Sequence, residues 1–138
     1  MIYETTISYI AIDRNGNDKT VKERYIVDNA QTFGECEDIM LELCQDFTDL
    51  DVVAIKRSKL QEFANQRTSQ QDRIFVADLE DTFVDDDGNE KEMKYSIAFY
   101  ALDISAAYSF ITEYIKQGYN MSLVALRKTK FVSYYNLK

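Results

Sequence analysis

The chain has 138 residues, of which 46% are apolar and 29% charged, and its formal net charge is −8. This length fits one domain or two half-size units that share a core. No apolar run reaches the roughly 20 residues that a membrane-spanning helix needs, so we expect a cytoplasmic protein without a membrane partner. The chain contains no histidine, which removes the usual general base near neutral pH and the common zinc ligand sets. We therefore expect no enzyme activity, no catalytic residue and no cofactor.

The first predicted element is a strand over residues 2–12, in which apolar and polar residues alternate. One face of this strand consists of Tyr3, Thr5, Ile7, Tyr9 and Ala11. The turn residues Asn15-Gly16-Asn17 tolerate positive φ and predict a hairpin. The returning strand places Val21, Tyr25 and Val27 on one face.

A helix follows, and the spacing of Thr32 and Glu35 predicts a capping box at its start. Its apolar stripe consists of Phe33, Cys36, Ile39, Met40, Leu43, Cys44 and Phe47. The two cysteines lie on the same helix face but about 12 Å apart along the axis, too far for a disulfide, so we interpret them as packing groups. A third strand ends in Val53-Ala54-Ile55-Lys56-Arg57.

The second half of the chain repeats the first. Asp85–Lys91 matches the turn Asp13–Lys19 at a shift of 72, and Val124–Phe131 matches Val53–Leu60 at a shift of 71. The second helix has the stripe Ala107, Phe110, Ile111, Tyr114 and Ile115, and Gly118 is placed to end it.

These patterns predict an α+β fold built by tandem duplication of a β-β-α-β unit. The first repeat covers 1–63, a polar linker covers 64–72 and the second repeat covers 73–138. We expect mainly antiparallel sheet, two helices packed on one face and a pseudo-twofold relation within one compact domain. Whether the repeats form one continuous sheet or pack face to face stays open.

The acidic turn Asp85-Asp86-Asp87-Gly88-Asn89 has two readings. Its oxygens could ligate calcium, but the glycine stands at loop position four rather than six. The place of the bidentate glutamate holds Arg24 in one copy and Ser96 in the other. A hairpin turn explains the same residues, so we predict no metal site.

The two third strands carry most of the clustered positive charge, and aromatic residues follow them. Cations beside aromatic rings on a sheet are typical of single-stranded nucleic-acid binding. The candidate nucleic-acid-binding residues are Lys56, Arg57, Lys59, Arg127, Lys128, Lys130, Tyr134 and Tyr135. The alternative is that these cations protect an exposed strand edge from aggregation. The negative total charge also weakens sequence-independent binding to DNA.

The chain contains 10 Tyr and 8 Phe, more than two helices need in their cores. Tyr95, Phe99 and Tyr100 place aromatic side chains on both faces of one strand. They are either buried between the units or form an exposed patch for a partner or a second copy of the chain.

The segment Glu23–Glu37, preceded by Tyr3-Glu4-Thr5, resembles a family of small uncharacterised proteins of Bacteroidota and their phages and mobile elements. The shared motif has the form Glu-x-Tyr-Leu-Val-Asp-Ala-x-Ser-Phe-x-Glu, and the resemblance as a whole covers about the first 60 residues. This sequence departs from it at Asn29, Gly34 and Cys36. The resemblance implies a source but no mechanism.

Three functional hypotheses follow. The first is a non-enzymatic binding or assembly protein, encoded by a phage or mobile element, that presents its sheet or repeat seam to a protein partner or to a second copy. The second is a single-stranded nucleic-acid-binding protein that uses the basic third strands. The third is an acidic nucleic-acid mimic that inhibits a host enzyme through Glu35, Asp38 and Glu42.

Overall fold

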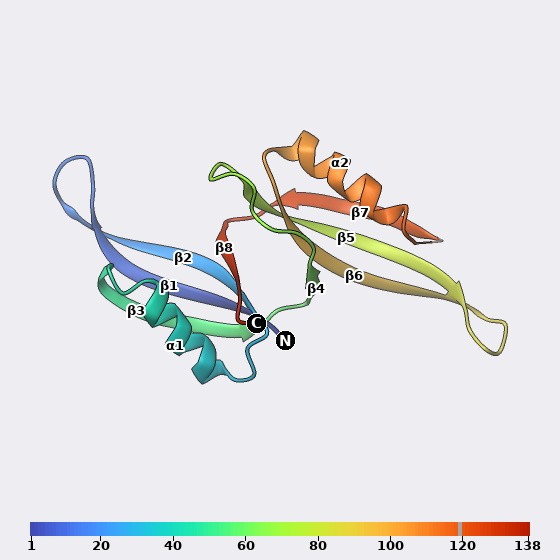
Figure 1. Cartoon of the computed structure of the whole chain (residues 1–138), viewed down its shortest axis with the longest axis horizontal. Helices are drawn as coiled ribbons and strands as arrows, with labels where there is room; N and C mark the ends of the chain where they lie inside the picture. The colour runs from blue at the N-terminus through green and yellow to red at the C-terminus, as the bar shows by residue number, and fades with distance from the viewer. Residues whose placement is uncertain (119) are drawn as a thin grey trace. The chain divides into compact units, whose positions relative to one another are not determined.

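The computed structural model describes residues 1–118 and 120–138, and it has the α+β fold that the sequence predicts (Figure 1). Two four-stranded sheets form, with strand orders β3-β1-β2-β8 and β4-β6-β5-β7. Both are mainly antiparallel. The elements in chain order are β1 (Ile2–Ile12), β2 (Asp18–Asp28), α1 (Phe33–Leu43), β3 (Thr48–Arg57), β4 (Leu60–Phe63), β5 (Arg73–Val84), β6 (Glu90–Ala101), α2 (Ile104–Ile115), β7 (Met121–Lys128) and β8 (Phe131–Asn136).

The chain divides into two compact units. Unit 1 contains Met1–Ser58 together with Lys130–Lys138, and unit 2 contains Lys59–Thr129. These units differ from the sequence repeats 1–63 and 73–138, because β4 belongs to unit 2 and β8 to unit 1. A local sequence pattern predicts a strand but does not identify the strand with which it pairs, so the repeat boundaries could not reveal this exchange.

In unit 1, β1 lies between β2 and β3 and is antiparallel to both, while β8 runs parallel to β2. α1 packs over β3 and β1. In the core, the side chains on the inward face of the β1–β2 hairpin pack against one face of α1. Its buried members are Tyr3, Ile7, Tyr25, Val27, Ala30, Cys36, Met40 and Cys44.

Two members of the predicted α1 stripe are not in the core. The side chains of Phe33 and Leu43 are 50% and 46% exposed, respectively. They are the first and last residues of α1, a helix of 11 residues. Phe33 instead places its ring edge-on against Tyr3, with centroids 5.2 Å apart.

The predicted cap of α1 forms in part. Thr32 Oγ1 accepts a hydrogen bond from the Glu35 backbone N–H at 3.1 Å, as expected for an N-cap. The Glu35 carboxylate accepts from the Gln31 backbone N–H at 3.2 Å, one residue before the group that a capping box uses. In α2 the N-cap is Asp103, whose Oδ1 accepts from the Ala106 N–H at 2.8 Å.

In unit 2, β5 lies between β6 and β7 and is antiparallel to both, while β4 runs parallel to β6. α2 packs over β7 and β6. The buried core consists of Phe75, Ala77, Leu79, Ile97, Phe99, Ala101, Ala107 and Ile111.

Residues 64–72 contain no helix or strand, as expected for the segment predicted as a linker, but they belong to unit 2 and bond to it. Asn65 exchanges two hydrogen bonds with the backbone of Tyr100, at 2.9 and 2.7 Å. The buried Asp72 carboxylate accepts from Thr68 N–H, Thr68 O–H and Ser69 N–H at 2.9, 3.1 and 3.1 Å. These bonds to the carboxylate lower the pKa of Asp72.

Gly118 does not end α2 in the way the sequence suggested. The helix ends at Ile115, three residues earlier, and Lys116 is its C-cap. A Cβ at Gly118 would lie 2.9 Å from Met121 Cε and 3.2 Å from Met121 Cβ. The glycine is therefore explained by the close approach of the first residue of β7.

The two hairpin turns are confirmed and have the same hydrogen bonds. Asp13 Oδ1 accepts from the backbone N–H groups of Asn15 and Asn17, and Asp85 Oδ1 accepts from those of Asp87 and Asn89. The glycines that follow, Gly16 and Gly88, have φ of 80° and 81°. This left-handed conformation is the reason for glycine at both positions.

The two units also share their strand registers. Ile2 pairs with Asp28 as Ile74 pairs with Tyr100, 72 positions later. From Ala30 and Ala101 onward the offset is 71, because Asn29 has no counterpart. Asn29 adopts φ 63°, a left-handed conformation that asparagine tolerates better than most residues. Unit 1 thus holds its one extra residue in the connection between β2 and α1.

Candidate functional site

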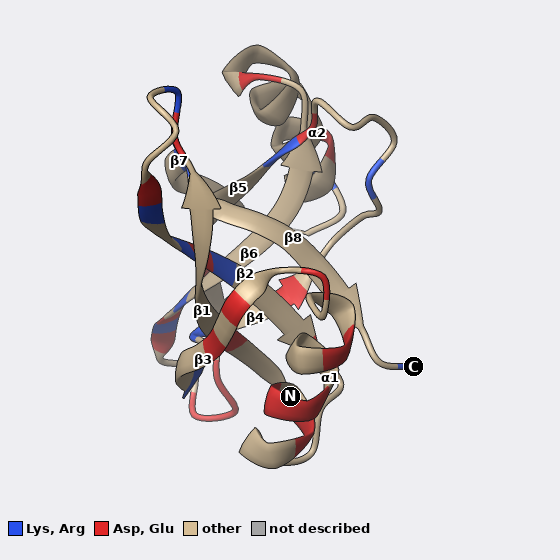
Figure 2. Cartoon of the chain, turned by 90° about the vertical axis from the view of Figure 1, so that its left-hand side faces the viewer, with Lys and Arg blue, Asp and Glu red and all other residues tan. Residues whose placement is uncertain are grey.

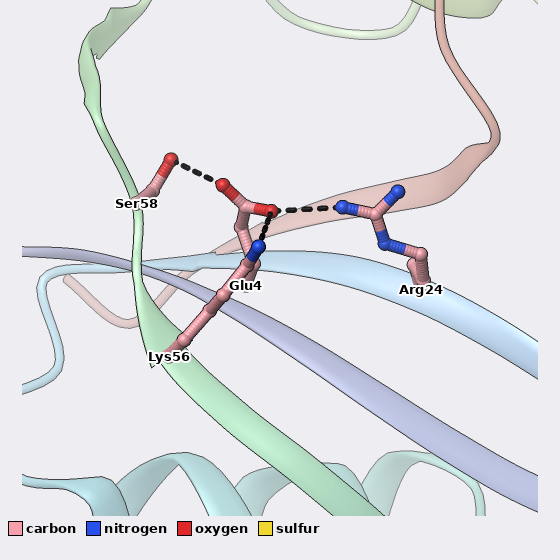
Figure 3. A network of polar contacts seen from close by, with 4 residues as sticks. All are labelled: Glu4, Arg24, Lys56 and Ser58. Atoms are coloured by element: carbon pink, nitrogen blue, oxygen red, sulfur yellow. Dashed lines mark hydrogen bonds and ion pairs between the residues drawn. The ribbon is translucent and has the colours of Figure 1, made fainter.

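The first basic strand leads to a polar network around Glu4 (Figure 3). Glu4 Oε1 accepts from Arg24 Nη2 at 2.9 Å and lies 3.8 Å from Lys56 Nζ. Glu4 Oε2 accepts from the Ser58 hydroxyl at 2.9 Å. The network therefore joins β1, β2 and the C-terminal end of β3 through one carboxylate.

The two cations of this network are not equivalent. The Glu4 side chain is 16% exposed, that of Arg24 43% and that of Lys56 71%. The Arg24 guanidinium also lies over the Phe131 ring, 4.4 Å from its centroid. Since solvent screens exposed ion pairs, Arg24 is the structural partner of Glu4, and Lys56 is held weakly.

Unit 2 contains a related pair on its own basic strand. Arg127 Nη1 lies 2.7 Å from Asp78 Oδ2, and the Ser96 hydroxyl donates to Asp78 Oδ1 at 2.6 Å. Lys56 and Arg127, the two residues that the sequence repeat aligns, thus each contact a carboxylate on the neighbouring strand of their sheet. Contact with a carboxylate reduces the net charge that either residue offers to a phosphate.

The structure places the six candidate cations in two units. Lys56, Arg57 and Lys130 belong to unit 1, whereas Lys59, Arg127 and Lys128 belong to unit 2. All six residues are exposed. The boundary between the units therefore divides the basic cluster of each sequence repeat, so neither unit contains a whole cluster.

The candidate stacking residues Tyr134 and Tyr135 lie on β8. Tyr135 packs against the core of unit 1 and stacks on Tyr25, with ring centroids 5.8 Å apart. Tyr134 donates its hydroxyl proton to Asp28 Oδ2 at 2.7 Å. Both rings are half-buried within unit 1, so neither is a fully exposed ring on which a base could stack.

The two basic strands are edge strands, and each contains a β-bulge at the matched position. The register of β3 against β1 shifts at Val53, and that of β7 against β5 shifts at Val124. Both valines are exposed. Bulges and lysines on an edge strand are a known protection against pairing with another chain. This arrangement favours the edge-protection reading of the basic residues.

The two cysteines are buried, free thiols that pack in the core of unit 1, as the sequence predicts. Burial and the neighbouring Glu35 carboxylate raise the pKa of Cys36 to about 11. Burial also raises the pKa of Cys44. Both thiols are therefore protonated at neutral pH and lack nucleophilic character there.

Within residues 1–118 and 120–138, no group of three or more Asp, Glu, Cys or His side chains is arranged to hold a metal ion. The acidic turns direct one carboxylate oxygen of Asp13 and of Asp85 to their own backbone. In the same described ranges no helix is long and apolar enough to cross a membrane.

Of the three aromatic residues that raised the question of an exposed patch, two are buried, and Tyr95 is partly buried against the core of unit 2. Phe99 lies in the core of unit 2, and Tyr100 is also buried. The Tyr100 ring is covered within unit 2 by the Phe63 ring at 5.1 Å and by the Arg67 guanidinium at 4.5 Å. These residues therefore form no exposed patch.

The exposed faces of the two helices differ strongly in charge. α1 carries acidic residues and no basic ones, as Figure 2 shows in colour. At an offset of 71, the exposed positions Glu35, Glu37 and Asp38 of α1 correspond to Ala106, Tyr108 and Ser109 of α2. The α2 face is thus uncharged where the α1 face is acidic.

Three large apolar residues mark this uncharged face, which we call the α2 face. The side chains of Leu102, Ile104 and Tyr108 are 53%, 54% and 59% exposed. The sequence interpretation missed them, because it followed only the buried stripe of each helix. The signal was present as the absence of acidic residues between Asp103 and Glu113, compared with the matched segment of the first repeat.

The fold and these surfaces define a small α+β protein of two mainly antiparallel four-stranded sheets, with a helix packed on each, charged strand edges and one uncharged helix face. The chain belongs to the family described as Domain of unknown function (DUF4494), whose model matches residues 1–137. The match covers nearly the whole chain, whereas the sequence resemblance rested on the first repeat. No curated protein and no solved structure matches the chain.

Proposed function

We propose that this chain is a non-enzymatic binding protein that docks a protein partner on the α2 face. The observation that carries the proposal is the contrast between matched helices. Leu102, which precedes α2, and Ile104 and Tyr108 on α2 are exposed, and the residues 104–112 around them carry no charge. α1 also exposes apolar residues such as Phe33, but its exposed surface carries carboxylates at Glu35, Glu37 and Asp38. In a chain of net charge −8, this surface can be buried against a partner without desolvating carboxylates, which burial of the matched α1 surface would require.

The composition of the α2 face suits a protein interface. Apolar and aromatic side chains, with few charges, are typical of the buried centre of such interfaces. Tyrosine combines a large apolar ring with a hydroxyl that can bond at the rim. Full burial of a large apolar side chain contributes about 1.5–3 kcal/mol, and these three are about half-exposed, so each offers roughly 1 kcal/mol.

The nucleic-acid hypothesis has weaker support. Lys56 and Arg127 contact carboxylates, and Tyr135 packs against the core. The acidic-mimic hypothesis rests on Glu35, Asp38 and Glu42, which are exposed on α1. An acidic solvated helix face is common, and Glu35 has a role in the helix start.

We further propose that the protein is encoded by a phage or mobile element of Bacteroidota and acts in the cytoplasm of the host. The support is the motif in residues 23–37.

The test exchanges the matched residues of the two helices. Tyr108→Glu puts a charge on the α2 face, and Glu37→Tyr removes one from α1 as the control. Tagged versions of both variants and the native chain are purified from source cells, and the proteins that accompany them are quantified by mass spectrometry. We expect a partner that is retained by the native chain and by Glu37→Tyr but lost from Tyr108→Glu.

A partner that is lost from Glu37→Tyr and retained by Tyr108→Glu would contradict the proposal and favour the acidic α1 face. The nucleic-acid hypothesis is tested separately by fluorescence anisotropy with labelled single-stranded DNA and RNA. Salt-sensitive binding that disappears in Lys56→Glu/Arg127→Glu would favour it.

A further inference from the structure

Each unit is completed by a strand from the other sequence repeat, and the exchange is reciprocal. β8 pairs with β2 through Phe131↔Arg24, Ser133↔Tyr25 and Tyr134↔Ile26. β4 pairs with β6 through Leu60↔Ser96, Glu62↔Ile97 and Phe63↔Ala98. Each β4 residue corresponds to the β8 residue 71 positions later, and its β6 partner corresponds to the β2 residue 72 positions earlier, so the two sets of pairs match one to one. The register shift also falls at the same place, at Gln61 in β4 and at Val132 in β8.

The points where the chain leaves one unit for the other match as well. The Ser58 N–H donates to the Ile2 carbonyl at 2.9 Å, and the Thr129 N–H donates to the Ile74 carbonyl at 3.0 Å. Two residues separate β3 from β4 and β7 from β8. The strand register, the position of the register shift and the point where the chain passes between the units all match. Duplication of a unit that exchanges its last strand explains the three matches together, whereas independent local causes do not.

We propose that the β2 edge of unit 1 is a strand-accepting slot that also binds residues 130–138 of a second copy of this chain. The strand that fills this slot in the monomer is β8, which is separated from the rest of unit 1 in the sequence by the whole of unit 2. The same pairing recurs on β6 with a different strand sequence, so the slot is a property of the sheet. A second copy carries the same residues 130–138 and offers the same contacts.

The contacts of β8 give the slot its specificity for this segment. Tyr135 and Leu137 pack against the core of unit 1, and the Tyr134 hydroxyl donates to Asp28. The Leu137 N–H donates to the Asp28 carbonyl at 3.1 Å, and Asn29 Nδ2 donates to Asn136 Oδ1 at 2.6 Å. An arbitrary peptide lacks this set, so the occupant that fits is a second copy.

Binding within one chain competes with binding between chains. A linked segment has an effective concentration on the order of millimolar, so the native monomer holds its own β8 when the protein is dilute. Exchange requires that β8 leaves the slot, which happens on unfolding. A dimer in which both copies exchange β8 is closed and satisfies both slots. The contact lies in unit 1 and does not involve the α2 face, so it stands apart from the proposed function.

The experiment uses two full-length variants that each add one cysteine, Asn29→Cys next to β2 and Asn136→Cys on β8. They are mixed in denaturant under reducing conditions, refolded together at high concentration and then oxidised. Cys36 and Cys44 are buried and free in the folded chain, so they do not compete once folding is complete. The control mixture pairs Asn136→Cys with Glu37→Cys, which is exposed on α1 of the same unit.

We expect the 29–136 mixture to give disulfide-linked dimer on the order of tenfold above the 37–136 control, since adjacent thiols have a high effective concentration. Dilution before refolding lowers this yield in proportion to protein concentration. Native proteins mixed without unfolding give much less. Equal yields in the two mixtures would overturn the proposal.

The double variant Asn29→Cys/Asn136→Cys provides the geometric control, because it forms the disulfide within one chain. If cysteine is not tolerated at the left-handed position of Asn29, the in-register pair Asp28→Cys and Asn136→Cys replaces it. Formation of the disulfide within the double variant, with none between refolded single variants, would also overturn the proposal.

Discussion

The Glu4 network makes a quantitative prediction about which cation the fold needs. Arg24→Ala removes a charge-assisted hydrogen bond of 2.9 Å to a carboxylate that is 16% exposed, and the cation–π contact with Phe131. Arg24 is 43% exposed, so its ion pair contributes at most about 1 kcal/mol. The cation–π contact adds about 0.5–1 kcal/mol. We expect the free energy of unfolding to fall by about 1–2 kcal/mol.

Lys56→Ala should cost much less, because Lys56 Nζ lies 3.8 Å from the carboxylate and the side chain is 71% exposed. We expect a loss below about 0.5 kcal/mol, which disappears at high salt. The assay is urea denaturation of both variants, alone and combined with Glu4→Gln, so that double-mutant cycles isolate each coupling energy. A coupling of Lys56 with Glu4 as large as that of Arg24 would refute the assignment of Arg24 as the structural partner.

Three further predictions concern the turns, the loop of unit 2 and the thiols. Gly16→Ala and Gly88→Ala should each reduce the free energy of unfolding by about 1 kcal/mol, because both residues have positive φ and open surroundings. Thermal denaturation measures the two losses. Strongly unequal losses would contradict the equivalence of the two turns. Folding lowers the pKa of Asp72, so its contribution to stability is present above the unfolded pKa and is lost as pH falls through the folded pKa. The stability difference between the native chain and Asp72→Asn should therefore be constant near neutral pH and shrink in acid, and a difference independent of pH would contradict this. Folding raises the pKa of Cys36 to about 11 and also raises that of Cys44, so the stability that the two protonated thiols contribute is present below the unfolded pKa and is lost as pH rises through the folded values. A thiol reagent at pH 8 should label both cysteines only after unfolding. Rapid labelling of the native protein would contradict this, because it would show that the thiols are accessible.

The features that the sequence predicted well are those with local causes. The hairpins follow from an aspartate that bonds its own backbone and a glycine with positive φ, both within five residues. The helix starts follow from side-chain caps at Thr32 and Asp103, although only Thr32 was identified beforehand. Alternation and helical spacing also identified most of the buried core, because burial on one face imposes these periods.

The features that the sequence did not predict depend on pairing at long range. Nothing in Leu60–Phe63 or Phe131–Asn136 tells which sheet each strand joins, so the exchange of β4 and β8 could not be derived. Phe33 is exposed at the first residue of α1, although the helical period places it in the apolar stripe, because the period alone does not show which members of the stripe the sheet covers. The candidate cations were identified by their clustering in the sequence, but the carboxylate partners of Lys56 and Arg127, Glu4 and Asp78, come from other strands.

The most direct test of the proposed function is site-specific photo-crosslinking in source cells. A photoreactive phenylalanine analogue replaces Tyr108 on the α2 face, and the matched control replaces Glu37 on α1. Both positions are exposed and stand 71 residues apart in corresponding places of the two units. We expect a discrete protein adduct from position 108 that is absent from position 37. Adducts of equal yield from both positions, or an adduct from position 37 alone, would contradict docking on the α2 face.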